Sequence, residues 1–217
     1  MIISFLRIAF VFLALSIGAQ DRPGDFKIIG PGGGGAMFHP TISPHDPNTV
    51  LVSCDMTGAY ISHDGGKSWR MFNLRGVVEF FVFDPLDKNV MYAQANGLWR
   101  SQDNGETWSL LYPKPSTVKG VKMSSDHSDE DLIADPNPLG NISAMAIDPG
   151  NSKIFYVAAG NRAKGVFGLF NSHDGGESWT RMGDLAEFAT KIWVNPLSPG
   201  ADRAFVVAGS DFIETRN

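Results

Sequence analysis

Short apolar runs separated by turn-forming residues recur along most of the chain. Three of them are rich in the β-branched and aromatic residues that suit a pleated, half-buried strand: Val50–Val52, Val90–Tyr92 and Ile154–Val157. Each is preceded by an apolar run that ends at a proline, in Phe38-His39-Pro40, Phe83-Asp84-Pro85 and Ile147-Asp148-Pro149. The pattern predicts repeated units of short strands joined by tight turns, without long helices.

An eight-residue motif follows each of these strand pairs. Its copies read Ser-x-Asp-x-Gly-x-Ser/Thr-Trp and are Ser62–Trp69, Ser101–Trp108 and Ser172–Trp179. In such a turn the aspartate accepts hydrogen bonds from nearby amides, the glycine supplies a positive φ, and the hydroxyl residue closes the turn. We therefore predict structural roles for all three aspartates and for the tryptophans that close the motif: Asp64, Asp103, Asp174, Trp69, Trp108 and Trp179.

The spacing of the motif predicts a β-propeller. The first two copies begin about 40 residues apart, which is the length of one four-stranded blade. Units are expected over residues 36–72, 77–112, 140–182 and 190–217 of a domain spanning 21–217, with an insertion loop over 113–139. Because propellers close with about 4 to 8 blades and the last unit stops in mid-motif, we expect an incomplete all-β propeller of about three and a half antiparallel blades.

The first 20 residues differ from the rest. One positive side chain lies within Met1–Arg7, an apolar stretch covers Ile8–Ile17, and small residues follow. This order is typical of a secretory signal peptide, and the apolar stretch is shorter than the roughly 20 residues of a membrane span. We predict a signal peptide over 1–20, a secreted or periplasmic protein, and no membrane insertion after cleavage. Cys54, the only cysteine, has no internal disulfide partner.

Composition narrows the class of ligand. The formal net charge is -5 at pH 7 and there is no basic run, which argues against nucleic acid and anionic membranes. The Gly32–Gly35 run lacks the Gly-Lys-Ser/Thr of a phosphate-binding loop. The histidines show no metal spacing, and the acidic stretch Asp126–Asp131 lacks the order of a calcium loop. We expect no cofactor and no metal, and a polysaccharide or glycan ligand, with protein ligands as the alternative.

The repeated motif resembles the Asp-box, or BNR repeat, of sialidases, which sortilin-type receptors and photosystem II assembly factors share. The resemblance is specific for the fold and says little about the reaction that the protein catalyses. The Phe/Tyr-Arg-Ile-Pro motif that carries the first substrate-binding arginine of sialidases is absent, and no spacing gathers the arginines. A sialidase-type enzyme therefore ranks third among the possible functions, after the two that are described below.

The segments Ile29–Ala36, Phe38–Pro40 and Val52–Tyr60 resemble the opening of xyloglucan-active endoglucanases and oligoxyloglucan hydrolases. In that family a glycine-rich stretch precedes the first blade, and an Asp-x-Gly-Gly-Ala-Tyr segment supplies one of two catalytic carboxylates. Asp55 matches that aspartate, while Thr57 departs from the first of the two glycines. We expect substrate-binding roles for Tyr60, Gly34 and Gly35, because aromatic rings and exposed backbone both suit a sugar.

The second resemblance implies a glycoside hydrolase that cleaves a β-glucan such as xyloglucan by an inverting, two-carboxylate mechanism, with Asp55 as the base. Such enzymes hold the two carboxyl groups about 6.5 to 9.5 Å apart to leave room for water. The matching acid comes from a second propeller in that family, beyond residue 217. The alternatives are a noncatalytic propeller that binds protein or glycan, and an Asp55 that only caps the turn before residues 59–62.

Overall fold

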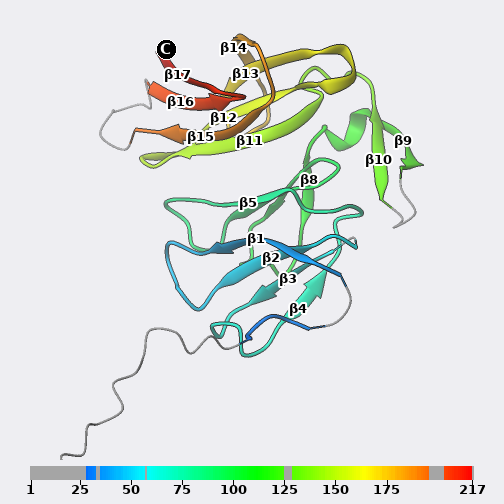
Figure 1. Ribbon diagram of the computed structural model, residues 1–217, viewed down its shortest axis with the longest axis vertical. Helices are drawn as coiled ribbons and strands as arrows, with labels where there is room; N and C mark the ends of the chain where they lie inside the picture. Colours follow the sequence, from blue (N-terminus) through cyan, green and yellow to red (C-terminus); the bar gives the residue numbers. More distant parts are fainter. Residues whose placement is uncertain (1–27, 33–34, 57, 125–128, 196–202, 217) are drawn as a thin grey trace, which may run out of the picture.

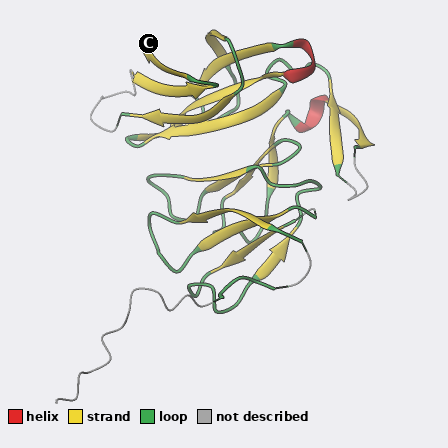
Figure 2. Ribbon diagram, in the orientation of Figure 1, coloured by secondary structure: helices red, strands yellow, loops and turns green. Residues whose placement is uncertain are grey.

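The computed structural model describes residues 28–32, 35–56, 58–124, 129–195 and 203–216 (Figure 1). The predicted signal peptide and Gly34 lie outside these residues. Regular structure in the described part is strand, apart from two 3-10 turns, η1 (Pro115–Thr117) and η2 (Arg162–Lys164) (Figure 2). The predicted all-β class is confirmed.

Apart from a two-stranded hairpin, the described residues form four antiparallel sheets that follow one another along the chain, each with its strands paired in chain order. Blade 1 holds β1 (Met37–Ile42), β2 (Val50–Cys54), β3 (Ala59–Ser62) and β4 (Arg70–Phe72). Blade 2 holds β5 (Phe80–Phe83), β6 (Met91–Gln94), β7 (Leu98–Ser101) and β8 (Ser109–Tyr112). Blade 3 holds β11 (Asn141–Asp148), β12 (Asn151–Asn161), β13 (Val166–Ser172) and β14 (Thr180–Leu185). Blade 4 holds β15 (Ala189–Val194), β16 (Arg203–Ala208) and β17 (Asp211–Arg216).

The first strand of each blade lies beside the first strand of the next. Strand β1 contacts β5, β5 contacts β11, and β11 contacts β15, so the sheets succeed one another from bottom to top in Figure 1. This is the arrangement of propeller blades around a central axis. It confirms the predicted architecture.

The hydrophobic core lies between consecutive sheets rather than inside any one of them. Strand β12 shows how one strand serves two interfaces, because its successive side chains point to opposite faces. Phe155 and Val157 pack against blade 2, whereas Tyr156 and Ala158 pack against blade 4. All four are almost completely buried, so each inner blade is stabilised mainly by its two neighbours.

Residues 113–139 are an insertion between blades 2 and 3, but the expectation of a loop without strands was wrong. The segment forms a hairpin of β9 (Val118–Met123) and β10 (Glu130–Ala134), which projects from the side of the molecule (Figure 1). No residue of either strand is fully buried. The sequence therefore lacks the continuous apolar face by which strands are recognised.

The first Asp-box has the predicted turn geometry. Asp64 Oδ1 accepts hydrogen bonds from the Ser62 hydroxyl at 2.8 Å and from the amides of Lys67 and Ser68 at 2.9 Å. Asp64 Oδ2 accepts from the Ser68 hydroxyl at 2.6 Å. Since one carboxylate satisfies donors from both ends of the turn, it fixes the turn and is not free for catalysis.

The other two boxes repeat this arrangement. Asp103 accepts from the amide and hydroxyl of Thr107 at 2.8 and 2.6 Å, and Asp174 accepts from those of Ser178 at 2.9 and 2.5 Å. Asn104, which stands where the other boxes have a first glycine, has a φ of 58°. Asparagine tolerates this left-handed conformation better than most residues, so the turn is preserved.

The box tryptophans join each blade to the one before it. Trp108 of blade 2 stacks on Phe72 at 5.0 Å between ring centroids, and Trp179 of blade 3 meets Tyr112 edge-on at 6.4 Å. Phe72 and Tyr112 are the last residues of the fourth strands of the preceding blades. In blade 1 the Trp69 indole instead donates to the Ile29 carbonyl at 2.7 Å.

Acid should weaken these turns. Hydrogen bonds from the box hydroxyls, and next from the turn amides, lower the pKa of Asp103 and Asp174 from 3.8 to about 2. A carboxyl whose pKa is lower in the folded state contributes stability above its unfolded pKa and loses it as the pH falls through the folded pKa. We expect the melting temperature, followed by circular dichroism, to fall between about pH 4 and pH 2.

The double variant Asp103→Asn/Asp174→Asn is the control for this pH dependence. It should melt at a lower temperature than the wild type at pH 7 and show a shallower decline between pH 4 and pH 2. An unchanged slope in that window would contradict the assignment of the acid sensitivity to the boxes.

Candidate functional site

Asp55 lies directly after β2, in the turn that leads to β3. Its amide donates to the Ala36 carbonyl at 3.1 Å, and its Oδ1 accepts from the Ala36 amide at 2.8 Å. The Cys54 thiol lies 3.7 Å from the same oxygen, within reach of a weak hydrogen bond. The half-buried carboxylate is thus held in one orientation, and it fastens the glycine-rich segment to blade 1.

Gly35 packs against this carboxylate. Its φ is +91°, and a Cβ on it would lie 2.5 Å from Asp55 Oδ1 and 2.8 Å from Cys54 Sγ. Both distances are too short for nonbonded atoms, so only glycine fits here without displacing Asp55. Asp55 therefore covers the side of Gly35 where a side chain would stand, while the rest of the residue is exposed.

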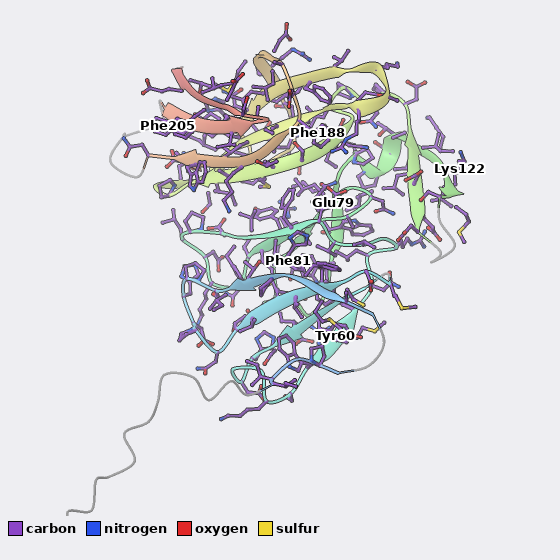
Figure 3. All side chains as sticks on the ribbon, viewed as in Figure 1. Tyr60, Glu79, Phe81, Lys122, Phe188 and Phe205 are labelled. Carbon is purple, nitrogen blue, oxygen red and sulfur yellow. The ribbon has the colours of Figure 1, made fainter. Side chains whose placement is uncertain are left out.

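Tyr60 is placed apart from Asp55. It lies on β3, opposite Val52 on one side and Met71 on the other, low in blade 1 (Figure 3). It lines a cleft of about 490 Å³ with the glycine-rich segment and the first Asp-box, including Trp69. Asp55 is not among the residues that line this cleft. The structure therefore does not place the predicted base, Asp55, and the predicted substrate-binding residue Tyr60 on this one cleft.

Glu79 is a carboxylate that the sequence did not single out. A parallel bridge between Gly58 and Val77 brings the segment before β5 against the turn that follows Asp55. Burial raises the pKa of Glu79, although part of the residue is exposed, and the charge of Arg162 partly offsets this effect. Glu79 lies between blades 2 and 3 (Figure 3), where it borders two hollows of the surface.

Within the described ranges, no three His, Cys, Asp or Glu side chains are placed to hold a metal ion. Asp126 and His127 of the acidic stretch lie outside those ranges. No helix in the described part of the chain is long and apolar enough to cross a membrane.

Comparison with known proteins agrees with this architecture. The chain matches the BNR/Asp-box repeat over residues 60–71 and 99–110, which cover the first two boxes. It is 28% identical over 169 residues to a xyloglucanase from a Paenibacillus species, and 30% identical over 161 residues to Xyloglucanase Xgh74A from Acetivibrio thermocellus. The protein is an Asp-box repeat β-propeller with distant similarity to xyloglucanases.

The similarity covers only part of the relatives. The two alignments span 64% and 63% of the Asp-box propeller, but only 15% and 18% of the xyloglucanases. Vacuolar protein sorting/targeting protein 10 from Mycosarcoma maydis is 31% identical over 96 residues, which cover 41% of the propeller and 6% of that protein. The two kinds of relative differ in function, so the shared repeat by itself assigns a fold.

Solved structures give the same result for the fold. The Asp-box propeller superimposes on an ancestral GH74 enzyme with a TM-score of 0.62 at 20% identity, over 87% of its own length and 24% of that chain. YCF48 from Cyanidioschyzon merolae superimposes with a TM-score of 0.53 at 14% identity, over 84% of the propeller and 51% of that chain. At these identities the likeness concerns the arrangement of the blades.

Proposed function

We propose that the Asp-box propeller is an extracytoplasmic protein that binds a neutral β-glucan such as xyloglucan and hydrolyses its O-glycosidic bonds, with Asp55 as the general base. The observation that carries the proposal is the fixed carboxylate. Asp55 is partly accessible and is oriented by the Ala36 amide, as a base that must address one water molecule requires. The partial similarity to xyloglucanases supports the choice of substrate.

In the proposed reaction Asp55 takes a proton from a water molecule as the water oxygen bonds to the anomeric carbon. The glycosidic C–O bond breaks, and a second carboxyl group protonates the leaving oxygen, which inverts the configuration at the anomeric carbon. We assign no residue of this chain as that general acid. The export of the protein is proposed from the signal-like residues 1–20.

The test is incubation of the protein with xyloglucan and mixed-linkage β-glucan. We expect new reducing ends, and NMR of the first product should show the α-anomer, since the substrate linkage is β and the mechanism inverts. Release of the β-anomer would contradict the inverting mechanism. Absence of any released sugar, with glycan binding retained, would contradict hydrolysis.

A noncatalytic propeller that binds protein or glycan is the second candidate. It is favoured by the contact between Asp55 Oδ1 and a backbone amide, which is what a turn-fixing aspartate makes, and by the similarity to vacuolar protein sorting/targeting protein 10. Under this alternative, Asp55→Asn leaves ligand affinity unchanged, and no glycan is cleaved.

A further inference from the structure

A polar cavity of about 280 Å³ lies between blades 2 and 3. The hairpin of β9 and β10 stands beside it, at the edge of the two blades in Figure 1. Both blades and the hairpin contribute polar residues to the lining of the cavity. They include Glu79, Gln94, Asn96, Asp131, Asn137 and Asn141. Among these residues, only Asp131 was named from the sequence, as the end of the acidic stretch Asp126–Asp131.

The cavity lies at the same end of the propeller as Asp55. In blade 1 the Cys54 amide donates to the Gly58 carbonyl across the turn between the second and third strands. In blade 2 the Ala95 amide donates to the Gly97 carbonyl in the same way. The turn that borders the cavity is thus the blade 2 equivalent of the turn that carries Asp55. Equivalent turns of consecutive blades lie at one end of a propeller, so one ligand can extend over both.

Gln94 supplies the observation that indicates a ligand. It is 4% exposed, and its Nε2 donates to the Ala95 carbonyl at 2.9 Å, which fixes the orientation of the amide. Its Oε1 is buried and accepts no hydrogen bond from the protein. Turning the amide over would point its oxygen at the Ala95 carbonyl, so a flip gives no better arrangement. Gln94 is one of the residues that line the cavity, so an occupant of the cavity is the available source of the missing donor.

The hairpin is fastened over the cavity by contacts with blades 1 and 2. Asn96 Nδ2 donates to the Glu130 carbonyl, and the Glu130 amide donates to the Arg75 carbonyl at 2.9 Å. An ion pair joins Arg75 Nη1 and Glu130 Oε2 at 3.0 Å. The next two residues of β10, Asp131 and Leu132, then line the cavity. The site is therefore formed before a ligand binds.

The lining defines the chemistry of the occupant. Two carboxylates, from Glu79 and Asp131, and the free Gln94 oxygen accept hydrogen bonds, and the side-chain amide of Asn141 can both donate and accept. Asn137 offers only its amide hydrogens, because its Oδ1 already accepts from the Tyr112 hydroxyl and the Gly140 amide. No Lys, Arg or His lines the cavity, so an anion is disfavoured. A compound with many hydroxyl groups fits this lining. The volume is below the range of about 300 to 1,000 Å³ typical of sites for larger ligands, which limits the occupant to a single ring.

We propose that this cavity binds one neutral sugar unit, a branch or end residue of the glycan whose main chain passes Asp55. The assignment rests on the proposed glycan ligand and adds a subsite to it. The hydroxyl groups of the sugar donate to Gln94 Oε1 and to the two carboxylates, and Leu132 and Ile142 contact its apolar edge.

The experiment measures binding of free xylose, glucose and galactose, and of a xyloglucan oligosaccharide, by NMR titration of the whole chain. Gln94→Met removes the buried acceptor with little change in size, and Asn141→Ala removes an exposed lining group. The control is Asn89→Ala, an exposed asparagine in the turn between β5 and β6 at the opposite end of blade 2. Circular dichroism establishes that each variant is folded.

We expect at least one of the monosaccharides to bind the wild type, and both lining variants to weaken it about tenfold, as loss of one net hydrogen bond predicts. Asn89→Ala should bind like the wild type. Equal affinities in all four proteins, or a crystal structure grown with the oligosaccharide that shows only water in the cavity, would overturn the inference.

The binding and hydrolysis measurements together distinguish a failure of the sugar subsite from a failure of the proposed function. If the protein hydrolyses glycan and the lining variants change neither affinity nor KM, the cavity inference fails and the proposed function stands. If a monosaccharide binds in the cavity and no glycan is cleaved, hydrolysis fails and the sugar subsite stands.

Discussion

The variant Asp55→Asn is expected to lower the rate of glycan hydrolysis by about 10²- to 10⁴-fold, which is the usual contribution of a general base. The amide has the size of the carboxylate, and its oxygen can still accept from the Ala36 amide, so the turn after β2 should keep its shape. It cannot take a proton from water. The loss should therefore appear in kcat, with little change in KM or in melting temperature.

Initial rates of reducing-end release give this comparison directly. Asp87→Asn is the matched control, because Asp87 is an exposed aspartate in a turn at the opposite end of blade 2. It should hydrolyse glycan at the wild-type rate. Full activity in Asp55→Asn would remove Asp55 from the mechanism and leave it as a turn residue.

Gly35→Ala is expected to affect both the fold of blade 1 and the site. A Cβ placed 2.5 Å from Asp55 Oδ1 must displace that carboxylate and break its contact with the Ala36 amide. The positive φ of Gly35 adds strain for any residue with a side chain. We expect the free energy of unfolding to fall by about 1 to 3 kcal/mol. The rate of hydrolysis should fall by much more than the loss of folded protein alone would cause.

Variants at two other glycines separate the effect of backbone strain from the effect of the clash with Asp55. Gly32 has a φ of +69°, and nothing lies within 4 Å of an added Cβ, so Gly32→Ala introduces the strain without the clash. Gly30 has neither feature, and Gly30→Ala should be close to neutral. Chemical unfolding and hydrolysis assays on the three variants give the ranking. If Gly35→Ala and Gly32→Ala lose the same activity, contact between Gly35 and Asp55 does not control the site.

The parts of the fold that depend on local chemistry were predictable from the sequence. The Asp-box is specified within eight residues, because one aspartate, one glycine and two hydroxyl groups close the turn among themselves. The blade strands were also predictable, since their two faces are buried between neighbouring sheets and leave dense apolar runs in the chain. The three box aspartates behave as the motif indicates.

The parts that depend on distant contacts were not predictable. The hairpin over residues 118–134 is held by Arg75 and Asn96, which lie far from it in the sequence. In the sequence, Gln94 looks like an ordinary strand residue. Its place in the cavity depends on blade 3 and the hairpin, which come later in the chain. The cleft that Tyr60 lines with residues 28–31 and the first Asp-box also depends on segments that are distant in the sequence. The Ala36 amide, which orients Asp55, has no signature in the sequence.

The stacking of box tryptophans on the preceding blade also gives the propeller a direction of assembly. Trp108 rests on Phe72 and Trp179 on Tyr112, so the surface that receives each blade is complete before that blade leaves the ribosome. In the first blade the box tryptophan makes its contact with the segment ahead of the blade, through Trp69 and Ile29. A chain built in this way can add blades in the order of synthesis, without waiting for its C-terminal end.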